Sequence, residues 1–214
     1  MNKKLIILIL TTVSLNASGQ YTRTKGSFEL GMRNTLSLFG NDNTFGFGTG
    51  GHFRIMLGKK LNTEWFADYI RTDLYNLGKR TDAHIGWSVM FYMLDEPKHL
   101  DPYLIAGHCF DFTKVRAYNV LTEVPNESTD RWSSAVQAGL GTHYYIGNRC
   151  NVTLAAQYML HLGTDIHAEE AQDATGKDFL SITEEGNGKL TFEGHLLVSL
   201  SLNFKIGNLW GQKI

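Results

Sequence analysis

The segment 194–204, with the sequence GHLLVSLSLNF, alternates between apolar and polar side chains. A period of two is the period of a β-strand, whose successive side chains point to opposite faces. Leu197 is the one apolar residue on the polar face, and a single exception leaves the period intact. The segment is therefore predicted to be a strand with an apolar face of Leu196, Val198, Leu200, Leu202 and Phe204 and a polar face of His195, Ser199, Ser201 and Asn203.

The same alternation recurs along the chain from residue 27 onward. Each alternating segment is at least as long as the roughly 9–11 residues that a tilted strand needs to cross a bilayer. The eight predicted strands are 27–39, 44–57, 62–72, 82–94, 103–115, 131–146, 150–164 and 190–204. An even strand number is usual in bacterial membrane barrels. The predicted fold is all-β, an eight-stranded antiparallel up-and-down transmembrane β-barrel.

The composition agrees with many strands joined by tight turns. The chain of 214 residues holds 22 Gly and only 3 Pro, and nothing marks a linker, so one domain is expected. The formal net charge is −1, which gives no bulk field that would favour nucleic acid as a partner.

The first 19 residues are predicted to be a secretory signal peptide. Lys3 and Lys4 precede an apolar run that ends in the small residues Ala17, Ser18 and Gly19. The run is too short for a membrane-spanning helix, which needs about 20 apolar residues. No Cys follows it, so a lipoprotein anchor is not expected. The predicted organisation is a leader over 1–19, a barrel over 20–204 and a C-terminal tail over 205–214.

The distribution of charge distinguishes a membrane barrel from a soluble one. On the eight apolar faces the charged residues are Arg71 and Lys114, and each lies near the end of its strand. A charge at the bilayer midplane would cost roughly 2–4 kcal/mol, so this is the pattern of a lipid-facing surface. A soluble barrel would carry charge outside. The opposite faces hold Glu29, Arg33, Arg54, Glu64, Asp68, Asp111 and Glu193.

The lengths of the connections predict which end of the barrel faces the outside of the cell. The connections after the second, fourth and sixth strands are short, whereas 116–130 and 165–189 are long and polar. Membrane barrels keep short turns on the periplasmic side and longer loops outside. The long connections are therefore predicted to be extracellular.

The chain resembles the small eight-stranded outer-membrane barrels of Gram-negative bacteria, of the OmpX and OmpA-barrel type, and especially their Bacteroidetes relatives. The likeness spans residues 27–204. It rests on the leader, the strand count, the segment from Pro102-Tyr103 to Ala106-Gly107, and a closing strand that ends at Phe204. The resemblance implies an outer-membrane location and a terminal aromatic residue read by the barrel-insertion machinery. The family usually ends at that residue, whereas this chain continues to Ile214.

Side chains just fill the interior of an eight-stranded barrel, so a packed polar core without an open channel is predicted. Pairing about the turns 40–43 and 58–61 places Arg54 opposite both Glu29 and Glu64. Because buried charges persist when they are paired, we interpret this cluster as structural. A gated pore or a proton path is the alternative interpretation.

His84 and Asp111 are predicted to be neighbours inside the barrel. A His–Asp pair is also part of catalytic triads, which need a nucleophile and an oxyanion site as well. Ser88 lies two inward positions away, and no G-x-S-x-G motif accompanies it. We therefore interpret the pair as a hydrogen bond of the lumen and assign no catalytic residue.

A run of possible metal ligands opens the longest connection. No spacing in it matches a known ligand frame, and acidic loops are usually solvated, so no metal and no cofactor are predicted. Lipid A deacylases of the same architecture carry a His-x-Ser pair. The pair is absent here, because Leu162 and Gly163 follow His161. The run consists of His161, Asp165, His167, Glu169 and Glu170.

The remaining candidate features predict no chemistry. Cys109 and Cys150 fall on different strands and opposite faces, so no disulfide is expected. The sequons at Asn126 and Asn151 are incidental in a bacterial barrel.

The predicted function is that of a non-enzymatic outer-membrane protein that acts as a structural or surface-binding protein through its extracellular loops, because binding residues concentrate on loops carried by a rigid scaffold. The alternatives are a subunit of a larger outer-membrane assembly for transport or secretion, and a lipid-modifying enzyme. The expected partners are outer-membrane lipid or lipopolysaccharide, the barrel-insertion machinery and an envelope protein.

Overall fold

The structure is a computed structural model that describes residues 21–39, 44–119, 122–163, 165–185 and 191–211. The predicted leader, the predicted turn at 40–43 and the side chain of Glu193 lie outside the described residues. Within the described ranges, no helix has the length and apolarity that crossing a membrane requires.

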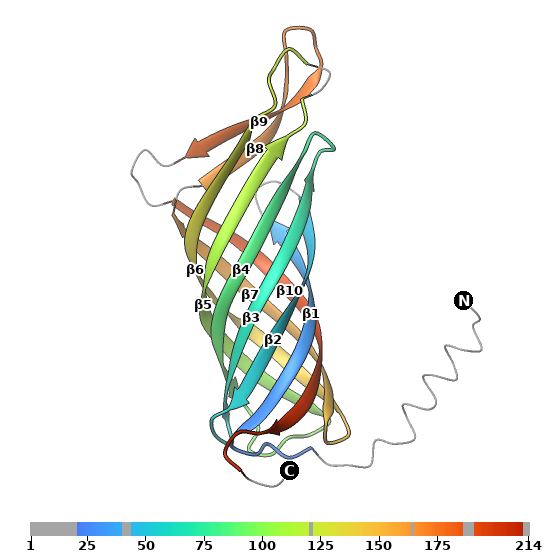
Figure 1. Cartoon of the computed structure of the whole chain (residues 1–214), viewed down its shortest axis with the longest axis vertical. Coiled ribbons are helices and arrows are strands. Elements are labelled where there is room, and N and C mark those ends of the chain that lie inside the picture. The colour runs from blue at the N-terminus through green and yellow to red at the C-terminus, as the bar shows by residue number, and fades with distance from the viewer. Residues whose placement is uncertain (1–20, 40–43, 120–121, 164, 186–190, 212–214) are drawn as a thin grey trace, which may run out of the picture.

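Eight strands close into an antiparallel barrel, as predicted (Figure 1). Their order around the barrel is β1-β10-β7-β6-β5-β4-β3-β2. The barrel strands are β1 (Ser27–Phe39), β2 (Phe45–Met56), β3 (Leu61–Leu74), β4 (Gly78–Tyr92), β5 (Leu100–Ala117), β6 (Ser128–Ile146), β7 (Cys150–Gly163) and β10 (Thr191–Asn208). Two further strands, β8 (Asp165–Gln172) and β9 (Asp178–Glu185), form a separate hairpin.

The seam between the first and last barrel strands closes the cylinder. β1 pairs with β10 from Phe39 opposite His195 to Ser27 opposite Asn208. The register shifts once, between Phe28 and Glu29. β10 therefore continues four residues beyond the predicted strand end at Phe204, and the first part of the predicted tail is paired strand.

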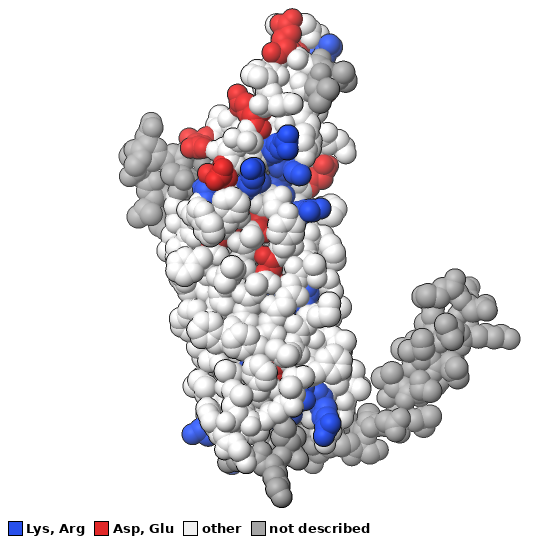
Figure 2. Space-filling view, viewed as in Figure 1, with Lys and Arg blue, Asp and Glu red and all other residues white. Residues whose placement is uncertain are grey.

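The two faces of the strands are as predicted. The outward residues are apolar and exposed, with Met32 73% exposed and Leu200 53% exposed. Figure 2 shows this surface as a broad band with few charged atoms, with Lys, Arg, Asp and Glu gathered mainly beyond its upper edge and further Lys or Arg at its lower end. A continuous apolar girdle of this size cannot face water stably, and it fits the hydrocarbon core of a bilayer.

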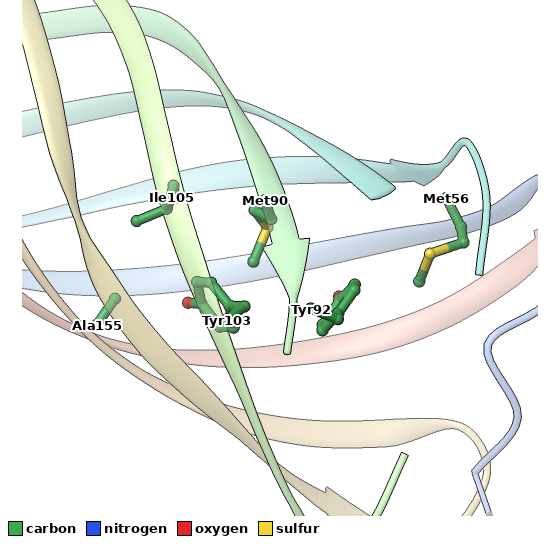
Figure 3. Close-up of a cluster of buried hydrophobic side chains, with 6 residues drawn as sticks. All are labelled: Met56, Met90, Tyr92, Tyr103, Ile105 and Ala155. Carbon is green, nitrogen blue, oxygen red and sulfur yellow. The ribbon is translucent and has the colours of Figure 1, made fainter. Parts of the chain in front are cut away.

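The interior is less uniformly polar than predicted. Alongside the expected polar residues, three clusters of buried apolar side chains lie on the inward faces. Figure 3 shows one of them, in which side chains from β2, β4, β5 and β7 point into the barrel. The second cluster contains Leu197, the exception noted in the alternation of β10, together with Phe66 of β3. Apolar residues at inward positions thus divide the polar lumen into layers.

The connection 165–189, predicted to be a polar loop, contains the β8–β9 hairpin. Its buried residues Ile166, Ala168 and Leu180 pack against inward residues at the upper ends of β3 and β5. The local alternation of residues 165–172 carries the signal for this strand. The hairpin covers the end of the barrel that carries the long connections, which we call the outer end, with an apolar contact, and Figure 1 shows it at the top of the molecule. The β5–β6 connection helps to hold it, since Asn119 Oδ1 accepts a hydrogen bond of 3.1 Å from the Leu180 amide.

The connection between β3 and β4 is also shorter than predicted. Both strands extend beyond the expected bounds and meet at a turn in which Tyr75 and Asn76 adopt a φ of 58°. This left-handed conformation is the one that tight hairpin turns require. The predicted connection of 73–81 is thus mostly strand. The connections after β2, β4 and β6 are short and lie at the opposite end, as predicted.

The segment that precedes β1 closes the end of the barrel that carries the short connections, which we call the inner end. The Tyr21 ring stacks on Tyr145 with 3.9 Å between centroids, and its hydroxyl donates to Glu29 over 2.5 Å. Arg23 donates to the carbonyls of Lys59 and Leu94 and lies 3.4 Å from the Asp101 carboxylate. Tyr21 and Arg23 are 4% and 6% exposed, so this segment is packed into the opening.

Removing residues 205–214 is expected to destabilise the barrel, because the start of β1 would lose the partners opposite Ser27, Phe28 and Glu29. Removal of 212–214 alone leaves these pairs intact and serves as the control. The samples are heated to a series of temperatures before electrophoresis. The measurement is the temperature at which the band of folded protein disappears. Equal thermal resistance of both truncated chains would contradict the role of the β10 extension.

Candidate functional site

An ion-pair network fills the middle of the lumen. Arg54 and Glu64 approach to 2.6 Å, and Arg33 lies 3.0 Å from the same carboxylate and 3.2 Å from Asp68. All four residues are buried. The predicted pairing of Arg54 with Glu64 is confirmed. Glu29 lies opposite Arg54 in register, as predicted.

This network is connected to the rest of the wall by neutral groups. Arg54 donates to Thr153 Oγ1 over 3.2 Å, and Asn203 Nδ2 donates to the same oxygen over 2.8 Å. His52 and Asn203 lie 2.5 Å apart, and Gly31 leaves room for them, since a Cβ there would come within 2.4 Å of the His52 ring. The middle of the lumen is therefore occupied by bonded side chains.

Above this layer lies a second polar cluster, which contains the predicted His84–Asp111 pair. His84 Nε2 lies 3.1 Å from Asp111 Oδ1, so the predicted contact is confirmed. The other oxygen of Asp111 lies 3.0 Å from His161 Nδ1. His161 Nε2 is 3.1 Å from His195 Nε2, and His195 Nδ1 is 3.0 Å from Ser37 Oγ. Five strands of the barrel wall, β1, β4, β5, β7 and β10, contribute to this cluster.

The cluster does not have the geometry of a hydrolytic triad. Ser133 Oγ lies 3.4 Å from His161, but at Nδ1, the nitrogen that also faces Asp111. A triad needs the serine and the carboxylate on opposite nitrogens of the ring. Ser88, the nucleophile considered from the sequence, instead accepts a hydrogen bond of 2.8 Å from Gln137.

The run of possible metal ligands, for which no metal is predicted, is not brought together. His161 lies inside the barrel, whereas Glu169 and Glu170 are exposed on β8. In the part of the chain that is described, the histidines whose ring nitrogens converge are His84, His161 and His195. His195 was missed as a partner because its approach to His84 comes from closure of the barrel. Its position on the polar face of 194–204 was the available signal.

The cysteines and sequons show no site. Cys109 and Cys150 are free thiols, and Cys109 Sγ lies 3.9 Å from Met159 Sδ. Asn151 is buried in the lumen, where a glycan has no room. Asn126 Oδ1 accepts a hydrogen bond from the Asn119 amide over 2.6 Å.

A basic patch lies on the outward faces of β3, β4 and β5, at the upper edge of the apolar band (Figure 2). A surface hollow of about 340 Å³ there is lined by Tyr69, Lys79, Thr81, Ala83, Phe112, Lys114 and Arg116. Arg71 adjoins it, with its guanidinium 5.1 Å from the Tyr69 ring centroid. Asp73 and Asp130 lie opposite Lys79 and Lys114 in register, so cations outnumber carboxylates. The patch contains both charges predicted at strand ends, Arg71 and Lys114.

Two of the exposed carboxylates outside the barrel wall have a lowered pKa. Hydrogen bonds from the Thr175 hydroxyl and the backbone of the β8–β9 turn lower the pKa of Asp173 to about 2. At the inner end, a hydrogen bond from Lys60 at 2.7 Å lowers the pKa of Asp95. Both groups are ionised at neutral pH and act in local turn structure.

Comparison with solved structures gives the same fold as the described geometry. The major outer membrane protein of Thermus thermophilus matches with a TM-score of 0.58 at 9% identity, covering 83% of this chain and 99% of that one. Neisserial surface protein A matches with a TM-score of 0.51 at 13% identity, covering 84% and 96%. OprG of Pseudomonas aeruginosa matches with a TM-score of 0.50 at 12% identity, covering 85% and 97%. No protein-family model and no curated protein sequence matches the chain.

These similarities confirm the predicted resemblance to small outer-membrane barrels at the level of the fold. The closer kinship with Bacteroidetes proteins stays a prediction.

Replacing Arg54 with Met is expected to lower the free energy of unfolding by about 3–5 kcal/mol, because it leaves the buried Glu64 carboxylate without its nearest cation. The double variant R54M/E64M removes both charges. Its free energy of unfolding should fall by less than the falls of R54M and E64M added together, since Arg33 keeps Asp68 as its partner. The measurement is urea unfolding in lipid vesicles followed by tryptophan fluorescence.

Lys60→Met, in an exposed pair with Asp95, is the control and should change stability by less than about 1 kcal/mol. If R54M were as stable as this control but altered ion conductance, the structural interpretation of the network would be wrong.

Proposed function

We propose that this chain is an integral outer-membrane protein with a closed lumen that acts through its outer surface, as a structural or surface-binding protein. The observation that carries the proposal is that the chain closes its own barrel at both ends. Tyr21 and Arg23 fill the inner opening, and the β8–β9 hairpin covers the outer one through Ile166 and Leu180. Between them lie bonded side chains, so solutes have no path through the barrel.

The outer surface is the part that stays available for binding. Ile166, Ala168 and Leu180 of the β8–β9 hairpin pack on the barrel, Glu169 is exposed on the opposite face, and Glu170 and Asp178 are exposed nearer the hairpin turn. Thr129 of β6 donates a hydrogen bond to Glu184 of β9, which adds to the packing that holds the hairpin in place. Rigid scaffolds that carry exposed loops commonly place binding residues there. We assign no reaction to the chain, since the Asp111 cluster lacks triad geometry and lies in the closed lumen.

The basic patch supports lipopolysaccharide as the lipid partner. Lys79, Lys114 and Arg116 lie at the outer edge of the apolar band, at the height expected for phosphate groups of the outer leaflet. Phe112 and Ala83 line the same hollow and offer apolar contact to an acyl chain. Cations near a membrane surface attract anionic headgroups with about 1 kcal/mol each.

The barrel-insertion machinery is the second proposed partner. Phe204 faces outward on β10 and is 48% exposed, so its ring is accessible before the barrel enters the membrane. The same strand continues to Asn208, which places the aromatic residue inside the strand.

The purified chain is expected to give no steady single-channel conductance in planar bilayers, because side chains occupy the lumen. The variant Y21A/R23A, which opens only the inner end, should behave in the same way, since the Arg33, Arg54 and Glu64 layer stays in place. A steady large conductance from the unmodified chain would overturn the closed lumen and with it the proposed function.

The variant K79Q/K114Q/R116Q is expected to retain lipopolysaccharide on the order of 100-fold more weakly than the unmodified chain, because it removes three cations at about 1 kcal/mol each. The measurement is binding to vesicles containing lipopolysaccharide at two salt concentrations. The control variant K59Q/K60Q removes charge at the inner end and should bind as the unmodified chain does. Equal binding of both variants would contradict the assignment of the patch.

A further inference from the structure

We propose that His84, His161 and His195 form a binding site for one first-row divalent cation, of the class of Zn²⁺ and Co²⁺, in the upper lumen. One ring nitrogen of each histidine lies within 4.8 Å of those of the other two. The three side chains are at most 1% exposed. The site is separate from the outer surface of the proposed function and does not depend on it. It also departs from the sequence analysis, which weighed a different set of ligands and predicted no metal.

Polar contacts within the cluster orient the three rings as metal ligands. Asp111 faces His84 through Nε2 and His161 through Nδ1, and Ser37 faces His195 through Nδ1. The second nitrogen of each ring is then the ligand atom. Histidines that bind metals almost always have the other ring nitrogen held in this way by a carboxylate or another polar group.

The spacing of the nitrogens fits a small ion. His161 Nε2 and His195 Nε2 are 3.1 Å apart. Two nitrogens bound at 2.0–2.1 Å to a tetrahedral ion are about 3.3 Å apart. His84 must approach by a further rotation of its ring, since the group spans up to 4.8 Å. Three imidazoles with one open position are the ligand set of Zn²⁺ sites, whereas Ca²⁺ and Mg²⁺ prefer oxygen.

Two observations at the site favour a bound cation. Both ring nitrogens of His84 are buried without a hydrogen bond of good geometry, and although Nε2 lies 3.1 Å from Asp111 Oδ1, Nδ1 is left as a buried polar atom, which is costly unless a ligand satisfies it. Asp111 is compensated by imidazoles, whereas Asp68, Asp82 and Asp101 each lie beside an arginine side chain. A buried carboxylate needs positive charge nearby, and a metal ion held by its histidine partners supplies it.

The surroundings would retain a bound ion. Below the cluster lies the apolar layer of Phe66, Met159 and Leu197, and above it Arg80 and Asp82 lead to the β8–β9 hairpin. The ligands come from β4, β7 and β10, and β4 pairs with neither β7 nor β10. An ion would therefore join parts of the barrel wall that no backbone hydrogen bond connects. Ion binding is therefore expected to stabilise the folded barrel.

The test is titration of the full-length folded chain, stripped of metal with a chelator, with Co²⁺ present either during refolding or afterwards. We expect one Co²⁺ per chain, with the visible absorption of a low-coordinate ion. H161Q and H195Q should abolish this signal, and D111N should weaken binding about 10–100-fold because it removes the group that orients two ligands. H143Q is the matched control, since His143 is equally buried but bonded to Thr153 and Tyr92 in a lower layer.

Both the unmodified chain and the variants can give a result that overturns the proposal. Absence of Co²⁺ and Zn²⁺ binding by the unmodified chain under both protocols leaves the cluster a hydrogen-bond network. Binding that survives in folded H161Q and H195Q comes from surface groups and also overturns it. If these variants do not fold, X-ray absorption of the unmodified Zn²⁺-loaded chain decides: three imidazole nitrogens at about 2.0–2.1 Å support the site, and one or none refutes it.

Discussion

Backbone hydrogen bonding at the seam between β1 and β10 is the constraint on which the rest of the structure depends. Inside a bilayer there is no water to satisfy an open strand edge, so the sheet must close on itself. The seam runs from Phe39 and His195 to Ser27 and Asn208, and it fixes which residues face inward all round the barrel. The segment 194–204 alternates polar and apolar side chains, so its apolar face can meet lipid only in this register. A shift of one residue would turn that face into the lumen.

Closure places charged side chains in a space with no solvent, and their pairing follows from that. Arg33, Arg54, Glu64 and Asp68 are buried together because each charge needs an opposite one nearby. Apolar residues at inward positions, such as Phe66 and Leu197, lie between much of this layer and the histidine cluster above it. The two layers meet at Asp68, which lies beside Arg33 and opposite His84 in register.

The sequence predicts what depends on local pattern and fails where distant strands meet. The eight barrel strands, their faces and the Arg54–Glu64 and His84–Asp111 neighbours follow from period two and from pairing about short turns. Tyr21 and Arg23 lie in a segment without periodicity, so their packing into the inner opening left no signal. The β8–β9 hairpin was taken for a loop because its charged outward residues hide a weak alternation. The approach of His195 to His84 requires barrel closure, since β10 and β4 are far apart in the strand order.

The histidine cluster differs from the ion-pair layer in how its charge is balanced. Arginine compensates Asp68, Asp82 and Asp101 directly, because the guanidinium is always charged and carries several donors. Asp111 has instead His84 and His161, which are neutral unless they gain a proton or the rings bind a cation. The 3.1 Å approach of His161 Nε2 to His195 Nε2 lets one of these rings donate a hydrogen bond to the other. In the proposed site, a metal ion would instead take a lone pair from each of the three rings at once.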